Sequence, residues 1–159
     1  MCVIFTLTIS YFLLLFANQA MADTYTVTRV FDGDTVEIKT KQAKFKLRLA
    51  DIDAPERNQA YGKKSRRALT QLCKERTVVI HVNLLGLDKY KRHLGHLQCN
   101  KIDAGTYLTA QGLAWHNAKY SHNPLTQEAE RNARRNKLGL WKTNNPMPPW
   151  VWREKHPLH

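Results

Sequence analysis

Hydrophobic and polar positions alternate in three short stretches of the first half of the chain. The stretches are 25–31, 35–40 and 44–51. Alternation with a period of two is typical of strands with one buried face, and the Asp32-Gly33 pair between the first two stretches is typical of a hairpin turn. Arg48 falls on the face opposite the apolar residues of the third stretch. The pattern therefore predicts a hairpin and a third strand that directs Arg48 away from the core.

A helical period replaces the alternation later in the chain. Asn123 and Pro124 form a typical helix start, and Gly112 and Gly139 are typical stops. The predicted helices are 61–74, 107–113 and 124–138, and two further strands are predicted at 77–82 and 94–99, on either side of a charged loop at 88–92. Strands that come early and helices that are interspersed or late predict an α+β domain.

The first 22 residues contain no charged side chain, and an apolar run occupies 3–17. The run is shorter than the roughly 20 residues of a membrane-spanning helix, and Ala20-Met21-Ala22 places small residues where a signal peptidase cuts. We therefore predict a signal peptide over 1–22 and an exported protein, periplasmic or secreted. Because no Lys or Arg precedes Arg29, an uncleaved anchor or a misassigned start stays open as an alternative.

The rest of the chain divides into one domain and a tail. A chain of 159 residues is long enough for one ordinary domain, which we place at 23–143. Residues 144–159 are rich in proline and contain Trp150 and Trp152, so we expect an extended tail that is pinned, if at all, by its tryptophans. Cys73 and Cys99 could form a disulfide or remain buried thiols, and the sequence does not decide between these states.

The charge of the chain indicates a polyanionic partner. Lys and Arg number 25 against 13 Asp and Glu, which gives a net charge of +12. All of these residues follow the uncharged leader, so the excess belongs to the mature domain. Such an excess promotes association with nucleic acid or with an anionic membrane surface, but it does not by itself indicate catalysis.

Three carboxylates are expected to gather at one end of the predicted sheet. Asp34 begins one strand, Asp53 ends another, and Pro55 stops that strand so that Glu56 falls in a loop at its tip. Two or three carboxylate oxygens suit a hard cation such as Ca²⁺, which also accepts backbone carbonyls and water. The incomplete shell leaves room for a substrate phosphate and an attacking water. The alternative is an acidic cluster that only forms salt bridges with Arg48.

Four motifs, in one order along the chain, resemble those of a known family. They are Val27-x-x-Val30-Phe-Asp-Gly-Asp-Thr35, Arg48-Leu-Ala-Asp-Ile-Asp-Ala-Pro-Glu56, Tyr61-Gly62 at the start of a helix, and Asp88-Lys-Tyr-Lys-Arg92. On these motifs, the stretch 25–141 resembles the thermonuclease, or staphylococcal nuclease-like, family. It departs from the founding member at Lys91, where that protein has Gly, and at Ala54, where it has Thr.

The resemblance implies a fold and an activity. The implied fold is a five-stranded OB-fold β-barrel with about three α-helices, and the implied activity is calcium-dependent hydrolysis of DNA and RNA by a monomer with little sequence preference. Arginines at the scissile phosphate would stabilise the negative charge of the transition state. The residues that the resemblance assigns are Asp34, Asp53 and the Ala54 carbonyl as calcium ligands, Glu56 as general base, Arg48 and Arg92 at the phosphate, and Lys89, Tyr90 and Tyr120 as substrate contacts.

Three alternatives compete with this hypothesis. A zinc site at His93, His96 and Cys99 is disfavoured because residues 93 and 96 of a strand face opposite sides. A non-catalytic nucleic-acid-binding module of the same fold would not need all the charged residues that the motifs retain. A membrane-surface or envelope protein would be favoured if the leader stayed uncleaved and nucleic acid failed to bind.

Overall fold

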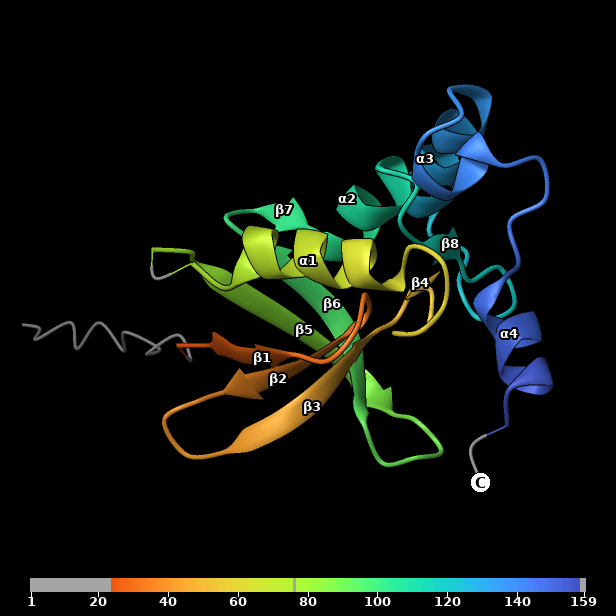
Figure 1. Ribbon diagram of the computed structural model, residues 1–159. Helices are drawn as coiled ribbons and strands as arrows, with labels where there is room; N and C mark the ends of the chain where they lie inside the picture. Colours follow the sequence, from red (N-terminus) through yellow and green to blue (C-terminus); the bar gives the residue numbers. More distant parts are fainter. Residues whose placement is uncertain (1–23, 76, 158–159) are drawn as a thin grey trace, which may run out of the picture.

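The computed structural model describes residues 24–75 and 77–157, which form strands early in the chain and helices at intervals after them. The predicted signal peptide lies outside the described residues. Figure 1 shows the arrangement. The strands are β1 (Thr26–Val30), β2 (Thr35–Lys39), β3 (Lys44–Leu49), β4 (Ile52–Asp53), β5 (Ile80–Leu87), β6 (His93–Cys99), β7 (Ile102–Asp103) and β8 (Trp115–His116). The helices are α1 (Gly62–Cys73), α2 (Ala104–Ala110), α3 (Pro124–Arg135) and α4 (Pro149–Lys155), with a 3-10 turn, η1 (Gly139–Lys142).

The main sheet has the strand order β1-β2-β3-β6-β5, and β7 adds to β6 as a sixth strand. Its pairs are antiparallel except β3 and β6, which run parallel. A separate two-stranded sheet joins β4 to β8. The α+β prediction is confirmed, but a closed five-stranded barrel with three helices is not, since the described part of the chain has four α-helices and its end strands β1 and β5 do not pair. Alternation identifies the faces of a strand and not its neighbours, so the sequence could not predict closure.

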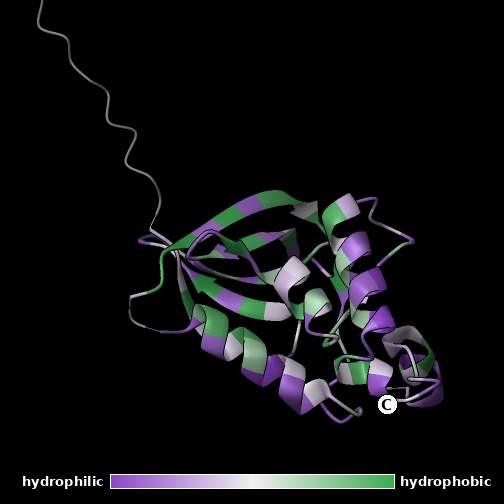
Figure 2. Ribbon diagram, turned by 90° about the horizontal axis from the view of Figure 1, so that it is seen from above, coloured by the Kyte–Doolittle hydropathy of each residue, from purple (hydrophilic) through white to green (hydrophobic). Residues whose placement is uncertain are grey.

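The core lies between the main sheet and the first two helices. Apolar side chains of β2, β3 and β6 are fully buried against Leu69 of α1 and Leu108 of α2. Along α1, the buried residues Ser65, Leu69 and Cys73 recur every four positions, so one face of the helix covers the sheet. Figure 2 shows hydrophobic and hydrophilic residues mixed along this helix, as expected when only one face is buried.

Four predicted elements differ from the structure. The helix predicted at 107–113 is α2, which begins at Ala104 because the side chain of Asp103 caps it, and which ends at Ala110. The strand predicted at 77–82 begins at Ile80 and continues to Leu87, because β5 pairs with β6 along its whole length. The helix predicted at 124–138 is α3, which ends at Arg135, and a separate 3-10 turn, η1, begins at Gly139. The prediction of an extended tail is wrong for 149–155, which is helical: Pro149 occupies the first helical position, where a missing N–H costs nothing. None of the helices in the described ranges is long and apolar enough to cross a bilayer.

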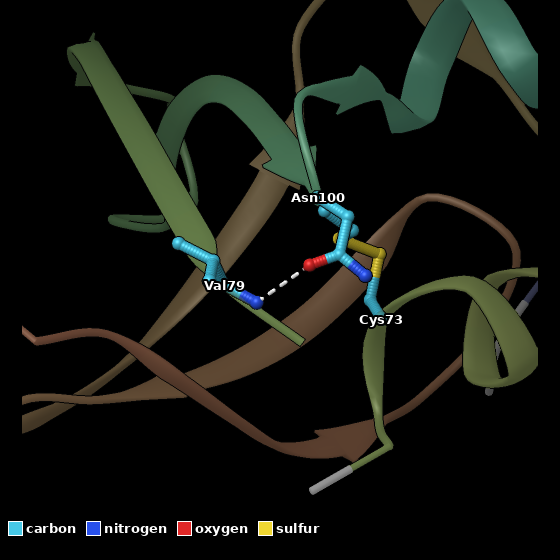
Figure 3. The surroundings of a disulfide bond; sticks show 4 residues. Cys73, Val79 and Asn100 are labelled. Atoms are coloured by element: carbon cyan, nitrogen blue, oxygen red, sulfur yellow. Dashed lines mark hydrogen bonds between the residues drawn. A yellow bond between two sulfur atoms is a disulfide. The ribbon is translucent and has the colours of Figure 1, made fainter. Parts of the chain in front are cut away.

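A disulfide joins the end of α1 to the end of β6, as Figure 3 shows. The Cα atoms of Cys73 and Cys99 are 5.2 Å apart, and both residues are buried. Beside the bond, the side chain of Asn100 accepts a hydrogen bond from the backbone N–H of Val79 at 2.8 Å. The pairing resolves the choice that the sequence left open. It also overturns the zinc alternative, because a disulfide sulfur no longer offers the thiolate that zinc binds.

We expect the disulfide to contribute substantially to stability. A bond across 26 residues restricts the unfolded chain enough to stabilise the fold by about 3.5 kcal/mol in the loop-entropy description. Urea denaturation with and without a thiol reductant, and of the Cys73→Ala/Cys99→Ala double variant, measures the difference. A free energy of unfolding that neither treatment changes would contradict the expectation.

Candidate active site

The pairing of β2 with β3 places Asp34 and Arg48 at the same end of the main sheet. Thr35 lies opposite Arg48, and the backbone N–H of Leu49 donates to the carbonyl of Asp34 at 2.8 Å. The turn that carries Asp34 is fixed by Asp32, whose side chain accepts a hydrogen bond from the Asp34 N–H at 3.0 Å. The hairpin predicted from alternation therefore positions one of the predicted metal ligands directly.

Gly33 allows this turn to pack closely against its surroundings. A Cβ atom at this position would lie 2.0 Å from the hydroxyl of Ser65 in α1 and 2.6 Å from the Cβ of Ala54. Neither contact is sterically allowed, so glycine is required unless α1 or the segment after β4 moves. The absence of a side chain at Gly33 thus brings the Asp34 turn, α1 and the end of β4 together.

Asp53 reaches the same place from the small sheet. In β4 it pairs with Trp115 of β8, and the next residue, Ala54, donates its backbone N–H to Asp34 Oδ2 at 2.8 Å. Pro55 is buried, and Glu56 follows it in a loop. The backbone N–H of Glu56 donates a hydrogen bond to the side chain of Gln59. The structure therefore brings Asp34, Asp53 and Ala54 into contact and leaves Glu56 in the loop beside them, as the sequence predicted.

One guanidinium group bridges the two aspartates. Arg48 Nη2 lies 3.2 Å from Asp34 Oδ2 and 3.0 Å from Asp53 Oδ1. Its Nη1 donates to the carbonyls of Leu49 at 2.5 Å and of Ile52 at 2.8 Å. The side chains of Arg48, Asp34 and Asp53 are only 12%, 8% and 6% exposed, so this is a buried ion-pair network rather than a solvated one.

Burial changes the ionisation of Asp34. Its removal from water raises the pKa of Asp34 to about 6, although the guanidinium of Arg48 and the N–H of Ala54 act in the opposite direction. The hydroxyl of Thr35 also donates to Asp34 Oδ1 at 2.9 Å. Asp34 is therefore an acid that is ionised at neutral pH but takes up a proton more readily than an exposed aspartate.

Arg153 of α4 also belongs to this cluster, and the sequence did not indicate it. Its Nη2 donates to Asp53 Oδ2 at 2.7 Å, and its Nη1 lies 3.2 Å from Asp53 Oδ1 and 2.8 Å from Glu56 Oε1. Hydrogen bonding to Asp53 raises the pKa of Arg153, against the opposing effect of burial. Because an extended tail was predicted, no pattern in the sequence placed this side chain within reach of residues about one hundred positions earlier.

The remaining predicted residues lie outside the cluster. Arg92 is bound to Asp88 within its own loop, with Nε 2.7 Å from Oδ2, and in the part of the chain described here no ion pair joins it to the three carboxylates. Tyr90 is 67% exposed, with Lys89 Nζ 5.0 Å and Arg92 Cζ 5.5 Å from its ring centre. Tyr120 is 75% exposed, in the loop before α3. Both tyrosine side chains are therefore accessible to a bound ligand.

The donor atoms of the cluster fit a hard cation better than zinc. A single nitrogen of Arg48 contacts both aspartates, so the two carboxylates lie next to each other, and the backbone of Ala54 adjoins Asp34. Within 24–75 and 77–157, no three His, Cys, Asp or Glu side chains form a complete metal site. Two carboxylates with backbone oxygen and water are acceptable to Ca²⁺, which does not need a full set of side-chain ligands.

The chain is similar in sequence to one known protein family and to several of its members. The model of a family described as staphylococcal nuclease homologue matches residues 46–143. A Haemophilus influenzae protein named "Uncharacterized endonuclease" is 37% identical over 149 residues, 93% of this chain and 83% of that relative. A protein of Escherichia coli O157:H7 with the same name is 35% identical over 130 residues, 81% of this chain and 84% of its own. A Shigella flexneri protein named "Micrococcal nuclease" is 35% identical over 138 residues, 80% and 78% of the two chains.

Removal of the bridging charge should destabilise the protein strongly. In an Arg48→Met variant, Asp34 and Asp53 would remain buried without their shared partner, and we expect a loss of about 3–5 kcal/mol in the free energy of unfolding at pH 7.5. Urea denaturation measures the loss. The control is Arg131→Met, which makes the same change in a pair with Glu128 where both side chains are about half exposed, and which should cost far less. Equal losses of unfolding free energy in the two variants would show that the buried ion pairs of Arg48 stabilise the fold no more than an exposed ion pair does.

Proposed function

Because the chain belongs to the staphylococcal nuclease family and is therefore a nuclease, we propose that it hydrolyses phosphodiester bonds of DNA and RNA with Ca²⁺ as its cofactor. The observation that carries the proposal is the joint position of Asp34 and Asp53 around Arg48, with Glu56 in the adjoining loop. A binding module would need positive charge alone. Buried carboxylates beside a phosphate-binding surface are costly to keep, and hydrolysis gives them a role.

In this proposal, Asp34, Asp53 and the carbonyl of Ala54 hold the cation. When bound, Ca²⁺ supplies a Lewis acid that polarises the phosphate and offsets its charge. The support from the protein is that both carboxylates contact the same nitrogen of Arg48. In addition, the backbone N–H of Ala54 and the hydroxyl of Thr35 donate hydrogen bonds to Asp34 and fix the direction in which its oxygens point. A preorganised pair of this kind needs little rearrangement to accept an ion.

Glu56 is the proposed general base. The Glu56 side chain is 37% exposed, so a water molecule can approach its carboxylate while the substrate phosphate is bound at the neighbouring cation. Its loop is fixed by a hydrogen bond from the Glu56 N–H to the Gln59 side chain at 3.0 Å, and Gln59 in turn donates to the carbonyl of Met147 at 2.6 Å. A carboxylate in this position accepts the proton of the attacking water, so no covalent intermediate is required.

Arg48 and Arg92 are the proposed electrophilic residues. Arg48 lies within the carboxylate cluster, and Arg92 is 31% exposed in the loop that precedes β6, the strand next to β3. The guanidinium of Arg92 can donate paired hydrogen bonds to phosphate oxygens. Both Nη atoms of Arg48 are already bound to the two aspartates and to the carbonyls of Leu49 and Ile52, so Arg48 would contribute its positive charge. Lys89, Tyr90 and Tyr120 would hold the neighbouring nucleotides by charge and stacking, without base choice. The net charge of +12 supports such non-specific association with nucleic acid.

The disulfide supports the proposal that the protein is exported. Disulfides persist in oxidising compartments and are rare in the cytosol, and Cys73 and Cys99 are paired here. Together with the uncharged apolar leader, the pairing favours a periplasmic or secreted protein whose mature chain begins at Asp23. Determination of the N-terminal residue of the protein purified from its host tests this, and a chain that begins at Met1 in the cytosol would contradict it.

The proposed mechanism predicts both cofactor dependence and a role for one carboxylate. Single-stranded DNA should be cleaved in Ca²⁺ and not after chelation, and Glu56→Gln should lower kcat by about 10²- to 10⁴-fold, the usual contribution of a general base. The rate of release of labelled fragments measures both effects. Binding of the DNA, followed separately, should be nearly unchanged, because the substitution removes a base and not a phosphate contact.

The matched control is Glu128→Gln on the exposed face of α3, which makes the same charge change on a surface carboxylate. Its kcat should equal that of the unchanged protein. Cleavage that survives chelation would remove the cation from the mechanism, and an unaltered kcat in Glu56→Gln would remove the assigned base. Tight, salt-sensitive binding without any cleavage would instead favour the non-catalytic module.

A further inference from the structure

The tail of the chain brings a second arginine into the carboxylate cluster. Arg153 donates to both oxygens of Asp53, at 3.2 Å and 2.7 Å, and to Glu56 at 2.8 Å. Its guanidinium therefore contacts one proposed ligand of the cation and the proposed general base at the same time. Neither role accounts for a positive side chain in this position.

The packing of Trp150 and Pro149 and a hydrogen bond to Met147 hold α4 where Arg153 can reach the cluster. Trp150 packs edge-on against Trp115, with ring centres 6.5 Å apart, and Trp115 is the residue that pairs with Asp53 across β4 and β8. Pro149 is buried, and the carbonyl of Met147 accepts a hydrogen bond from Gln59 in the Glu56 loop. Figure 1 shows α4 on the side of the molecule where β4 and β8 lie. The position of Arg153 thus follows from the packing of the tail and not from one ion pair alone.

Arg153 and a cation require the same atoms. Both oxygens of Asp53 already accept hydrogen bonds from Arg153, and Oδ1 is shared with Arg48. An ion bound to Asp53 would lie within a few ångströms of the guanidinium, where two positive charges repel in a partly buried site. The two occupants therefore exclude or weaken each other.

The charge of the cluster leads to the same conclusion. The three carboxylates and two guanidinium groups carry a net charge of −1 when Arg153 is in place, and of −2 when it has left. Departure of Arg153 therefore adds one unit of negative charge to the attraction for a divalent cation. The cluster with Arg153 bound is closer to neutrality, and this is the arrangement that the described residues adopt.

We propose that Arg153 is an internal competitor for the cation: it occupies Asp53 and Glu56 in the cation-free protein and has to leave before the ion binds. The proposal rests on the proposed function, since it takes Asp53 as a ligand of the cation. Arg153 thereby sets the cation concentration at which the site becomes active. It is a residue that tunes the site, and it takes no part in the reaction itself.

The exposure of the two arginines explains why only one of them would leave. The side chain of Arg153 is 48% exposed, so its guanidinium can regain hydration when it leaves Asp53 and Glu56. Arg48 is 12% exposed and is bound in addition to two backbone carbonyls. A divalent ion can therefore displace Arg153 by a change of side-chain rotamer or by release of α4, while Arg48 remains.

The test is a calorimetric titration of the full chain with Ca²⁺ alone, without nucleic acid, for the unchanged protein and for Arg153→Ala. Loss of the competitor should lower the Kd for Ca²⁺ by about tenfold, within the 5- to 150-fold range usual for coupling between two ligands. The control is Lys155→Ala, which removes the same charge from the exposed side of the same helix. Its Kd should change by less than about twofold, because salt screens an exposed charge at that distance.

Arg153→Lys separates geometry from charge. Lysine keeps the positive charge but cannot contact both oxygens of Asp53 in the paired geometry of a guanidinium, so its Kd should fall between those of the unchanged protein and Arg153→Ala. Thermal unfolding of each variant in chelator shows that the fold is retained. If Arg153→Ala alone fails to fold, the lysine variant decides the question by the same comparison.

The outcomes distinguish this inference from the proposed function. An equal Kd for Arg153→Ala and Lys155→Ala would overturn the competition while the calcium site stands. Weaker binding in Arg153→Ala would also overturn it and would indicate that Arg153 helps to hold the site together. If neither the unchanged protein nor Arg153→Ala binds Ca²⁺, the proposed cation site itself is wrong and the inference is wrong with it.

Discussion

The acidic end of the sheet depends on the guanidinium of Arg48. Two aspartates that are 8% and 6% exposed approach the same nitrogen atom, and in the absence of that charge they would repel each other and lose their hydration without compensation. The second nitrogen of the group is fixed by the carbonyls of Leu49 and Ile52. Arg48 therefore joins the end of β3, the turn before β2 and the strand β4, and the shape of the site is determined largely by one side chain.

The two aspartates belong to different sheets, so the site also depends on how these sheets meet. Asp34 precedes β2 of the main sheet, whereas Asp53 lies in β4, which pairs with β8 in a separate sheet of the described residues. The close approach of Gly33 to Ala54 and to Ser65 of α1 leaves little room for one sheet to slide against the other. The backbone N–H of Ala54, the residue after Asp53, donates to Asp34 Oδ2, so a hydrogen bond also joins the two sides at this point. The packing around the turn and this bond together preserve the distance between two aspartates that share no local structure.

The sequence could predict those parts of the site that local rules determine. The hairpin turn, the alternation that directs Arg48 away from the core and the stop at Pro55 are each set by a few neighbouring residues, and together they place Asp34, Arg48 and Asp53 at one end of the sheet. The disulfide could not be predicted, since the separation of Cys73 and Cys99 depends on how α1 lies against β6. The extension of β5 to Leu87 likewise comes from its pairing with β6 and not from its own composition.

Arg92 and Arg153 differ in the carboxylates that they contact, and these contacts determine where each side chain lies. Arg92 forms an ion pair with Asp88, four residues before it. This local pair keeps Arg92 out of the carboxylate cluster and in a partly exposed loop. Arg153 reaches Asp53 and Glu56 only because α4 folds as a helix and packs beside β4. Its position could not be predicted from the residues around it, since it depends on a tertiary contact across almost the whole chain. The cluster has more carboxylates than arginines, so a half-exposed arginine that comes within reach is held there by charge. Under the two proposals above, the same residue type would bind substrate in one place and compete with the cation in another.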